Sequence, residues 1–413
     1  MSILIKAALV ENKRKDIYIE DSRIVEVAES ITTEADHKIS GKSKAAIPSF
    51  VNGHTHAAMT LLRGYADDME LMPWLEEEIW PTEAKMRKED IYWGSKLACL
   101  EMIKSGTTFF NDMYWEPEQT IRAAEESGIR SLIGLLMIDF DKRGSPGEIK
   151  KRLSGISHNK HLTRLSIDPH AIYTVSKENL AWAGDFAAKN SLPMHIHLSE
   201  TRDEVEDCIN KHKMRPVEYL ESIGFLEQRV IAAHAVWLNE TELDICKKRG
   251  VRLIHNPVSN MKLSVGNVIN YKGITARKIP LALGTDGCSS NNSLDMFDDM
   301  KIAALLQKHH NTDSTVLPAN EIFDIATVSG AKVFSLNSGE IKEGNDADLL
   351  LINLKNNLLV PHHNIISNIV YSANSECVDT TICNGRILMQ GRKVEGEEEI
   401  IEKFNEHAAS LAR

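Results

Sequence analysis

The chain has 413 residues, of which 42% are hydrophobic and 26% are charged. This length exceeds one ordinary compact domain and suits a single (β/α)₈ barrel with a small satellite domain, while the composition excludes disordered, collagen-like and coiled-coil chains. The 48 basic and 59 acidic side chains give a formal net charge of −11, which disfavours a nucleic-acid partner but leaves small anionic groups open.

The sequence predicts a cytoplasmic protein. No run approaches the roughly 18 apolar residues of a membrane-spanning helix, and Met1–Lys6 opens no signal peptide. The cysteines lack the spacing of a disulfide framework or a C-x-x-C pair, so we expect reduced thiols. They are Cys99, Cys208, Cys246, Cys288, Cys377 and Cys383.

Short segments with the two-residue period of β-strands lie near both ends of the chain. They are Ile3–Ile5, Asp16–Glu20, Arg23–Val27, Ala347–Ile352 and Val378–Arg386. Neither group alone makes a sizeable sheet. We therefore predict one small β-sandwich domain built from residues 1–46 and 343–396, and two unrelated β-rich flaps are the alternative.

Between these groups, short apolar strands alternate with longer amphipathic segments, which is typical of repeated βα units. The predicted strands are Ile47–His56, Gly106–Met113, Ser131–Met137, Leu165–His170, Met194–Leu198, Val230–Val236, Arg252–Asn256 and Leu281–Asp286. The predicted helices include Ile91–Ser105, Glu118–Ser127, Lys177–Asn190, Glu240–Arg249 and Ser293–His309. We therefore predict an α/β fold with a TIM-like (β/α)₈ catalytic barrel over residues 47–342 and a surface helix over residues 397–413.

Titratable side chains gather at the ends of the predicted strands, where the active site of such a barrel lies. They are His54, His56, Asp168, His170, His195, His197, Glu200, His234, His255 and Asp286. Histidines two residues apart on a strand point to the same face, so His54 and His56 could bind one metal ion. Taken alone, that pair fits a polar strand end equally well.

The other strand ends favour a metal site. Three imidazoles and the carboxylate of Asp286 form the nitrogen-rich shell, with room for water, that catalytic zinc requires. We predict one Zn²⁺ per chain, with iron and manganese as the alternatives.

The motifs, in their order along the chain, resemble those of the amidohydrolase superfamily. Within it they are similar to the 5′-methylthioadenosine/S-adenosylhomocysteine deaminases, including the 5′-deoxyadenosine deaminase branch. The resemblance spans almost the whole chain. It rests on Pro48–His56, Met59–Gly64, Trp74–Glu77, His197–Thr201, Ala233–His234, Asn256–Pro257, Ser259–Asn260, Lys262–Leu263, Gly284–Gly287, Ser290–Ser293 and Gly344–Leu349.

The resemblance implies roles for individual side chains. It implies that the metal ligands are His54, His56, His197 and Asp286. His195 would then be a structural neighbour. Glu200, three positions after His197, would be the general acid and base.

The implied activity is hydrolytic deamination of 5′-modified adenosines in the salvage of S-adenosylmethionine by-products. The substrates would be 5′-deoxyadenosine, 5′-methylthioadenosine, S-adenosylhomocysteine and, as a further candidate, adenosine. Glu200 and Asp286 would take up the proton of water, and Glu200 would pass it to the purine N1 with His234 beside the tetrahedral centre.

Substrate contacts also follow from the resemblance. Glu83 matches a glutamate that binds the ribose hydroxyls, and His170 matches a histidine that contacts the nucleoside. Trp74 could wall the 5′ side, although core packing explains it equally well.

The sequence departs from the family beyond the third barrel strand. Relatives that handle S-adenosylhomocysteine well have arginines there for its carboxylate. Here the first basic residues after the third strand are Lys142 and Arg143, and Arg130 lies at the opposite end of that strand. We therefore expect a preference for small 5′ substituents.

Other functions remain open. A binuclear cyclic-amide hydrolase would need a lysine at the end of strand four, and Leu165–His170 contains none. A deaminase or dehalogenase of another heterocycle, such as guanine or a triazine, fits less well because Glu83 would contact ribose. A barrel that had lost its activity and served only as an assembly scaffold should have lost metal ligands, and none of the four is missing. We expect no nucleic-acid or membrane partner, and a homo-oligomer (dimer or tetramer) stays open.

Overall fold

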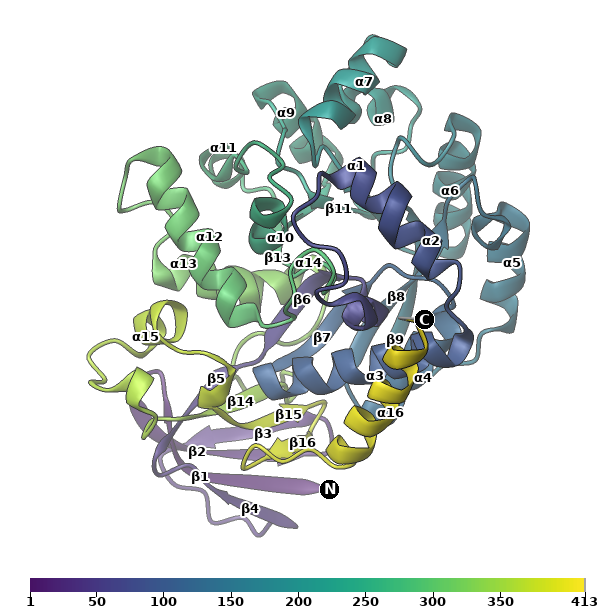
Figure 1. The fold of residues 1–413 in the computed structure, drawn as a ribbon. Helices are drawn as coiled ribbons and strands as arrows, with labels where there is room; N and C mark the ends of the chain where they lie inside the picture. The colour runs from purple at the N-terminus through teal and green to yellow at the C-terminus, as the bar shows by residue number, and fades with distance from the viewer. Residues whose placement is uncertain (412–413) are drawn as a thin grey trace.

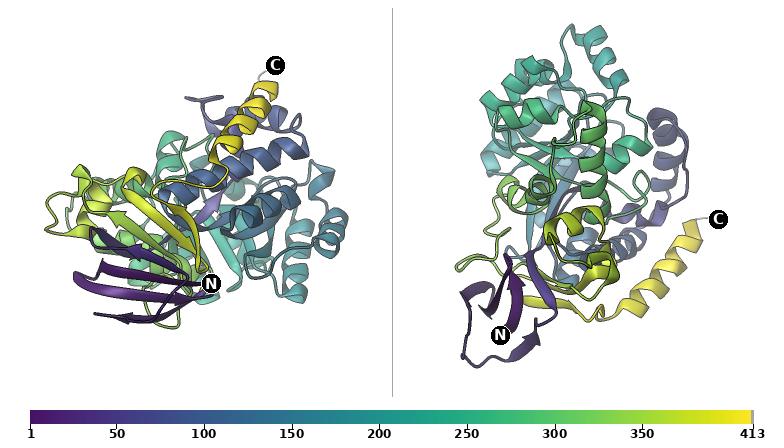
Figure 2. Two further views of the ribbon diagram at one scale, coloured as in Figure 1. Left: turned by 90° about the horizontal axis from the view of Figure 1, so that it is seen from below. Right: turned by 90° about the vertical axis from the view of Figure 1, so that its left-hand side faces the viewer.

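The computed structural model describes residues 1–411. A barrel of parallel strands surrounded by helices forms the larger unit, and strands from the two chain ends form a second sheet beside it (Figure 1). Two further views show the same side-by-side arrangement (Figure 2). Within residues 1–411, no helix combines the length and apolar character needed to cross a bilayer.

The barrel sheet confirms the predicted fold class. It has eight parallel strands that pair in the order of the sequence. The strands are β6 (Phe50–Thr55), β7 (Thr107–Asp112), β8 (Arg130–Met137), β9 (Thr163–Pro169), β10 (Met194–Leu198), β11 (Val230–His234), β12 (Arg252–His255) and β13 (Leu281–Leu283).

Side chains and backbone together close the barrel between its first and last strands. The Asn52 side chain donates to Thr285 Oγ1 at 2.8 Å and accepts from the Thr285 amide at 3.0 Å. The amide of Asp286 donates to the carbonyl of His54 at 2.9 Å. These bonds hold two of the predicted metal ligands, His54 and Asp286, on neighbouring strand ends.

Helices follow most strands and cover the outside of the barrel (Figure 1). They are α3 (Lys88–Ser105), α4 (Pro117–Ser127), α5 (Pro146–Gly155), α6 (Lys177–Asn190), α7 (Arg202–His212), α8 (Pro216–Ser222), α9 (Glu240–Arg249), α10 (Pro257–Lys262), α11 (Tyr271–Ala276), α12 (Met296–Asn311), α13 (Ala319–Asp324) and α14 (Gly330–Val333). Local signals explain their ends. At α9, Asn239 and Glu242 form a reciprocal capping box, and Gly250 ends the helix at a φ of 71°.

A helical insertion lies between β6 and α3. It comprises η1 (Ala57–Leu62), α1 (Leu71–Pro73), η2 (Trp74–Ile79) and α2 (Trp80–Glu83). It brings Trp74 and Glu83 to the carboxyl end of the barrel, where both line a cavity.

The terminal strands form one continuous mixed sheet, so the alternative of two unrelated flaps is wrong. The sheet contains β1 (Ser2–Val10), β2 (Lys13–Glu20), β3 (Arg23–Ala28), β4 (His37–Ser40), β5 (Lys44–Pro48), β14 (Leu349–Asn353), β15 (Val378–Cys383) and β16 (Arg386–Gln390). Its core joins both chain ends, with Ile3, Ile5 and Ile17 packed in one cluster with Leu349 and Leu351.

Two predicted strands are divided in the structure. Ile47–His56 contributes Ile47 and Pro48 to β5 and Phe50–Thr55 to β6, because the chain leaves one sheet for the other at Ser49. Val378–Arg386 contains a hairpin turn at Asn384 and Gly385, whose φ angles are 50° and 71°. Two successive positive φ values favour this Asn-Gly sequence.

Ion pairs attach the flanking elements to the barrel. Arg130, at the start of β8, pairs with Asp346 at 2.7 Å and also with Asp348, so it links the barrel to the terminal sheet. The last helix, α16 (Glu397–Leu411), lies along α3, where His407 Nδ1 is 2.5 Å from Asp90 Oδ1. Residues 412–413 of the predicted helix lie outside the described residues.

Close packing inside the barrel predicts that one added methyl group at Gly134 strongly lowers stability. A Cβ at Gly134 would overlap the buried carboxylate of Asp168. We expect Gly134→Ala to lower the free energy of unfolding by about 2–3 kcal/mol in chemical denaturation, as overpacking does. Gly184→Ala is the matched control, because a Cβ there meets nothing within 4 Å. Equal stability of the two variants would contradict this packing.

Candidate metal centre and active site

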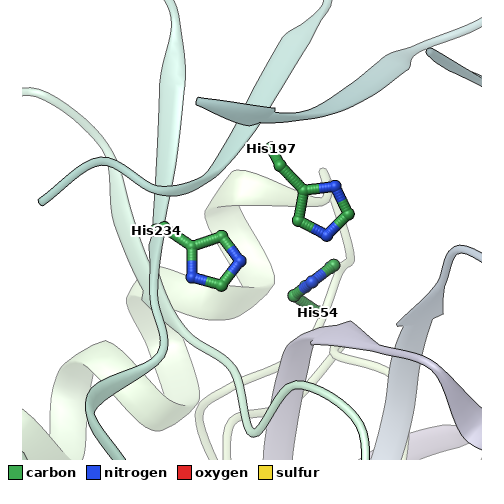
Figure 3. A group of neighbouring side chains, drawn as sticks. All are labelled: His54, His197 and His234. Atoms are coloured by element: carbon green, nitrogen blue, oxygen red, sulfur yellow. The ribbon is translucent and has the colours of Figure 1, made fainter. Parts of the chain in front are cut away.

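The carboxyl ends of four barrel strands bring imidazole rings and a carboxylate together. The rings of His54, His197 and His234 face one another (Figure 3), and one nitrogen from each lies within 4.8 Å of the others. His54, His56 and Asp286 form a second group that meets the same distance limit. The two groups share His54, so they make one cluster.

A second polar group orients each predicted ligand ring through its Nδ1 atom. His54 Nδ1 lies 2.8 Å from His195 Nε2, His56 Nδ1 lies 2.6 Å from the Met113 carbonyl, and His197 Nδ1 lies 2.8 Å from the His170 carbonyl. Such contacts fix the tautomer and ring angle of metal-binding histidines. His195 contacts the His54 ring in this way, and its role as a structural neighbour stays a prediction.

The Nε2 atoms of these rings converge. Those of His54 and His56 lie 3.3 Å and 3.2 Å from Asp286 Oδ1, and those of His56 and His197 lie 3.3 Å apart. The Nε2 atom of His54 is buried and has no hydrogen-bond partner within residues 1–411. A buried nitrogen without a partner is costly, and a bound cation would satisfy it.

The charges of the cluster suit a divalent cation. Burial lowers the pKa of His54 to about 4 and that of His197 well below its ordinary value, so both rings are neutral at neutral pH. Burial alone would raise the pKa of Asp286, but the neighbouring rings of His54 and His56 hold it well below its usual range. These side chains could therefore hold a divalent metal ion.

His56 differs from the other two rings. Burial opposes its charge, yet contact with Asp286 raises the pKa of His56 to about 9. A metal ion at this site would therefore displace a proton from the ring, as metal binding commonly does.

Glu200 stands beside the cluster, next to the ring of His234. Glu200 Oε1 lies 3.5 Å from His234 Nδ1, which in turn lies 2.8 Å from Asn260 Oδ1. Burial raises the pKa of the Glu200 carboxyl above its ordinary value. A raised pKa makes a carboxyl group a better proton acceptor, which suits a general acid and base. His234 has a φ of 70° and Asp286 has a φ of 67°, in the left-handed region that non-glycine residues adopt uncommonly.

Sequence reasoning missed Glu204, which holds the turn that carries Glu200. Its carboxylate accepts hydrogen bonds from the amides of Ser199 and Glu200, both at 2.8 Å. The signal was present, because Thr201 and Glu204 have the spacing of a capping box. Thr201 does cap the helix, but the glutamate reaches further back than a capping box requires.

A cavity opens next to the cluster and contains the three predicted substrate contacts. His170, Glu83 and Trp74 all line it, together with Glu200, His234 and Asp286. Glu83 is 6% exposed, and burial raises its pKa although Tyr114 and Trp115 act as hydrogen-bond partners. Trp74 donates its indole N–H to the Ala66 carbonyl at 2.9 Å, so it is both a cavity wall and a packed core residue.

Several cavity residues were not predicted as site residues. Tyr114 and Trp115 follow β7 directly, and the rule that strand ends carry the site would have found them. Ser290 lies in a motif that had been recognised. It donates to Asp286 Oδ2 at 3.0 Å, and Ser259 donates to the same oxygen at 2.6 Å.

Comparison with known proteins agrees with this geometry. Residues 45–388 match the model of the amidohydrolase family. The chain belongs to that family. A 5-methylthioadenosine/S-adenosylhomocysteine deaminase from Archaeoglobus fulgidus is 46% identical over 99% of this chain and 97% of its own. A 5′-deoxyadenosine deaminase from Methanoregula boonei is 45% identical over 96% of this chain and 92% of its own.

A solved structure extends the similarity to three dimensions. The crystal structure of an adenosine deaminase from Xanthomonas campestris with bound zinc has a TM-score of 0.95 and 31% identity, and the match covers 99% of this chain and 98% of that one. This amidohydrolase therefore shares its entire architecture, including the terminal sheet, with a zinc-containing relative.

The contacts of Glu204 predict a loss of stability when both acceptor oxygens are removed. Glu204→Met would leave two buried amides without partners, at about 1–3 kcal/mol each. We expect the free energy of unfolding to fall by about 2–4 kcal/mol in urea denaturation. Glu206→Met, at an exposed position of the same helix, should change stability by less than about 0.5 kcal/mol. A small effect at both positions would show that Glu204 does not hold the turn.

Proposed function

We propose that this amidohydrolase is a cytoplasmic zinc-dependent deaminase of 5′-modified adenosines, with 5′-deoxyadenosine and 5′-methylthioadenosine as preferred substrates. One observation carries the proposal: Glu200 and His234 stand beside the four candidate ligands, at the floor of a cavity that also holds the buried Glu83. The names of the relatives from Archaeoglobus fulgidus and Methanoregula boonei support the substrate class.

His54, His56, His197 and Asp286 would hold the zinc ion. When bound, such an ion lowers the pKa of a water molecule from about 15.7 to about 7, which makes hydroxide available at neutral pH. Iron or manganese would fit the same nitrogen and oxygen donors.

The chain's own acids would then move the protons. Glu200 takes up the proton of the attacking water and delivers it to N1 of the purine, which makes C6 electrophilic. His234, 3.5 Å from Glu200 Oε1, faces the tetrahedral carbon that follows addition at C6. Asp286 takes part in the second proton transfer, which moves the proton of the added hydroxyl to the 6-amino group. Ammonia then leaves and the 6-oxopurine remains.

Glu83 and His170 would recognise the rest of the nucleoside. The buried Glu83 carboxylate accepts hydrogen bonds from the two ribose hydroxyls, a contact that a free base such as guanine or a triazine would leave unmade. His170, which lines the same cavity, would contact the nucleoside, and Trp74 would close the cavity on the 5′ side.

The charges beyond β8 support a preference for small 5′ groups. Asp141 already engages the Arg143 guanidinium, with distances of 3.0 Å and 2.7 Å from its Oδ2 atom to Nε and Nη2. Arg143 stacks over the ring of Trp115, a cavity wall, at 4.2 Å. A guanidinium neutralised by Asp141 offers little attraction to the carboxylate of S-adenosylhomocysteine.

Incubation of the zinc-loaded protein with 5′-deoxyadenosine tests the proposed activity. We expect release of ammonia together with the ultraviolet change from adenine to hypoxanthine. Glu200→Gln should lower kcat by about 10²–10⁴-fold, because the amide cannot carry the proton, while metal analysis finds the ion still bound. Glu206→Gln, on the surface of α7, should leave kcat unchanged. Full turnover in Glu200→Gln would remove this residue from catalysis.

Substrate preference gives a separate prediction. We expect kcat/KM for 5′-deoxyadenosine and 5′-methylthioadenosine to exceed that for S-adenosylhomocysteine, in parallel assays of the three nucleosides. Asp141→Asn would free Arg143, so it should raise the relative kcat/KM for S-adenosylhomocysteine. A wild-type preference for S-adenosylhomocysteine would overturn the assigned specificity.

A further inference from the structure

A second cavity lies at the opposite end of the barrel from the metal centre. Its volume is about 510 Å³, within the range of small-molecule sites. Its charged walls come from the amino-terminal ends of three barrel strands: Arg164 near the start of β9, Arg229 just before β11 and Arg252 at the start of β12. The catalytic side chains lie at the carboxyl ends of the same sheet, so a ligand here would not compete with the nucleoside.

The lining of this cavity is strongly basic. Besides these three arginines it includes His158 and Lys160, and it contains no acidic residue. Arg229 pairs with Glu227 at 2.8 Å, but Arg164, Arg252 and Lys160 make no ion pair within residues 1–411. The chain as a whole has a net charge of −11, so this cluster of unpaired cations has the opposite sign to the rest of the protein.

The two unpaired guanidiniums are held in place but keep most of their donors free. Arg164 donates to the Phe334 carbonyl at 2.7 Å, and Arg252 donates to the Val333 carbonyl at 2.5 Å. These carbonyls lie at the end of α14, whose partial negative charge attracts cations. Each guanidinium has five N–H groups, and only one of each forms a hydrogen bond within the described part of the chain.

Repulsion between the guanidiniums also favours a bound anion, in addition to their unused N–H groups. The exposed Arg164 and the half-buried Arg252 lie close enough for their positive charges to repel each other. An anion between the guanidiniums would relieve that repulsion, and phosphate matches their planar fork with two parallel hydrogen bonds. The remaining walls are apolar and include Leu165, Ile231 and Phe334.

We propose that this cavity binds a small organic phosphate. The phosphate lies between Arg164 and Arg252, with Lys160 at the entrance, and the organic part contacts the apolar walls. Such a ligand would act at a distance from the catalytic site, and its binding does not depend on the proposed deaminase activity.

Calorimetric titration of the zinc-loaded full chain with phenyl phosphate tests this site. We expect saturable binding of one equivalent that weakens as salt is added, because the contact is ionic. Phenol, which lacks the phosphate, should not bind. Arg164→Gln and Arg252→Gln should each weaken binding by about tenfold or more, the effect of losing charge-assisted hydrogen bonds. Arg277→Gln removes a half-buried arginine that pairs with Glu240 and Asp244 away from this cavity, and this variant should bind like the wild type.

The alternatives give different results. If the arginines only stabilise the end of α14, their substitution lowers the unfolding midpoint and leaves phenyl phosphate binding unchanged, which would overturn the proposal. If the probe binds at the metal centre, it inhibits the deaminase competitively and binds all variants equally, with the same consequence. Lys160→Gln keeps the test valid if an arginine variant fails to fold. The exposed Lys160 forms no hydrogen bond within residues 1–411, and its loss should still weaken binding about threefold.

Discussion

The cluster that the rings of His54, His56 and His197 form with the carboxylate of Asp286 is the constraint on which the rest of this structure depends. The cluster is almost completely buried, and the Nε2 atom of His54 has no hydrogen-bond partner within the described chain. Such a group of polar atoms persists only if a ligand compensates for its burial. A divalent cation does so and also gives the cluster its chemical use.

The architecture around the cluster follows from this requirement. The barrel closes where Asn52 meets Thr285, so that His54 and Asp286 stand on adjacent strand ends. Contacts through Nδ1 turn the rings inward, and the carboxylate of Glu204 fixes the turn that presents Glu200. The terminal sheet contributes none of the residues that line the catalytic cavity, and the ion pairs of Arg130 attach it to the amino end of β8.

Much of the fold could be predicted from the sequence because local signals repeat in it. The bounds of β10, α6 and α9 agree with the prediction, since alternation, helix caps and terminal residues all indicate the same limits. The exchange of sheets at Ser49 could not be predicted, because two buried apolar strands in succession have the same pattern as one long strand. The histidines and Asp286 could be found because they end strands. Glu204 has the spacing of a capping box after Thr201, but this spacing does not reveal that its carboxylate reaches back to the amides of Ser199 and Glu200. The hydrogen bond between Arg143 and Asp141 is likewise not revealed by spacing.

The two ends of the barrel thus differ in the charge of the ligand that they suit. At the carboxyl end, buried imidazole nitrogens and a carboxylate suit a cation. At the amino end, the guanidiniums suit an anion, as we propose. The most direct test of the cation site is zinc K-edge X-ray absorption on protein loaded with one equivalent of zinc. A single ion should be surrounded by nitrogen and oxygen atoms at about 2.0–2.2 Å, with a strong imidazole signal. Sulfur neighbours at about 2.3 Å, which would place zinc on the cysteines, or failure to retain the ion would contradict the account.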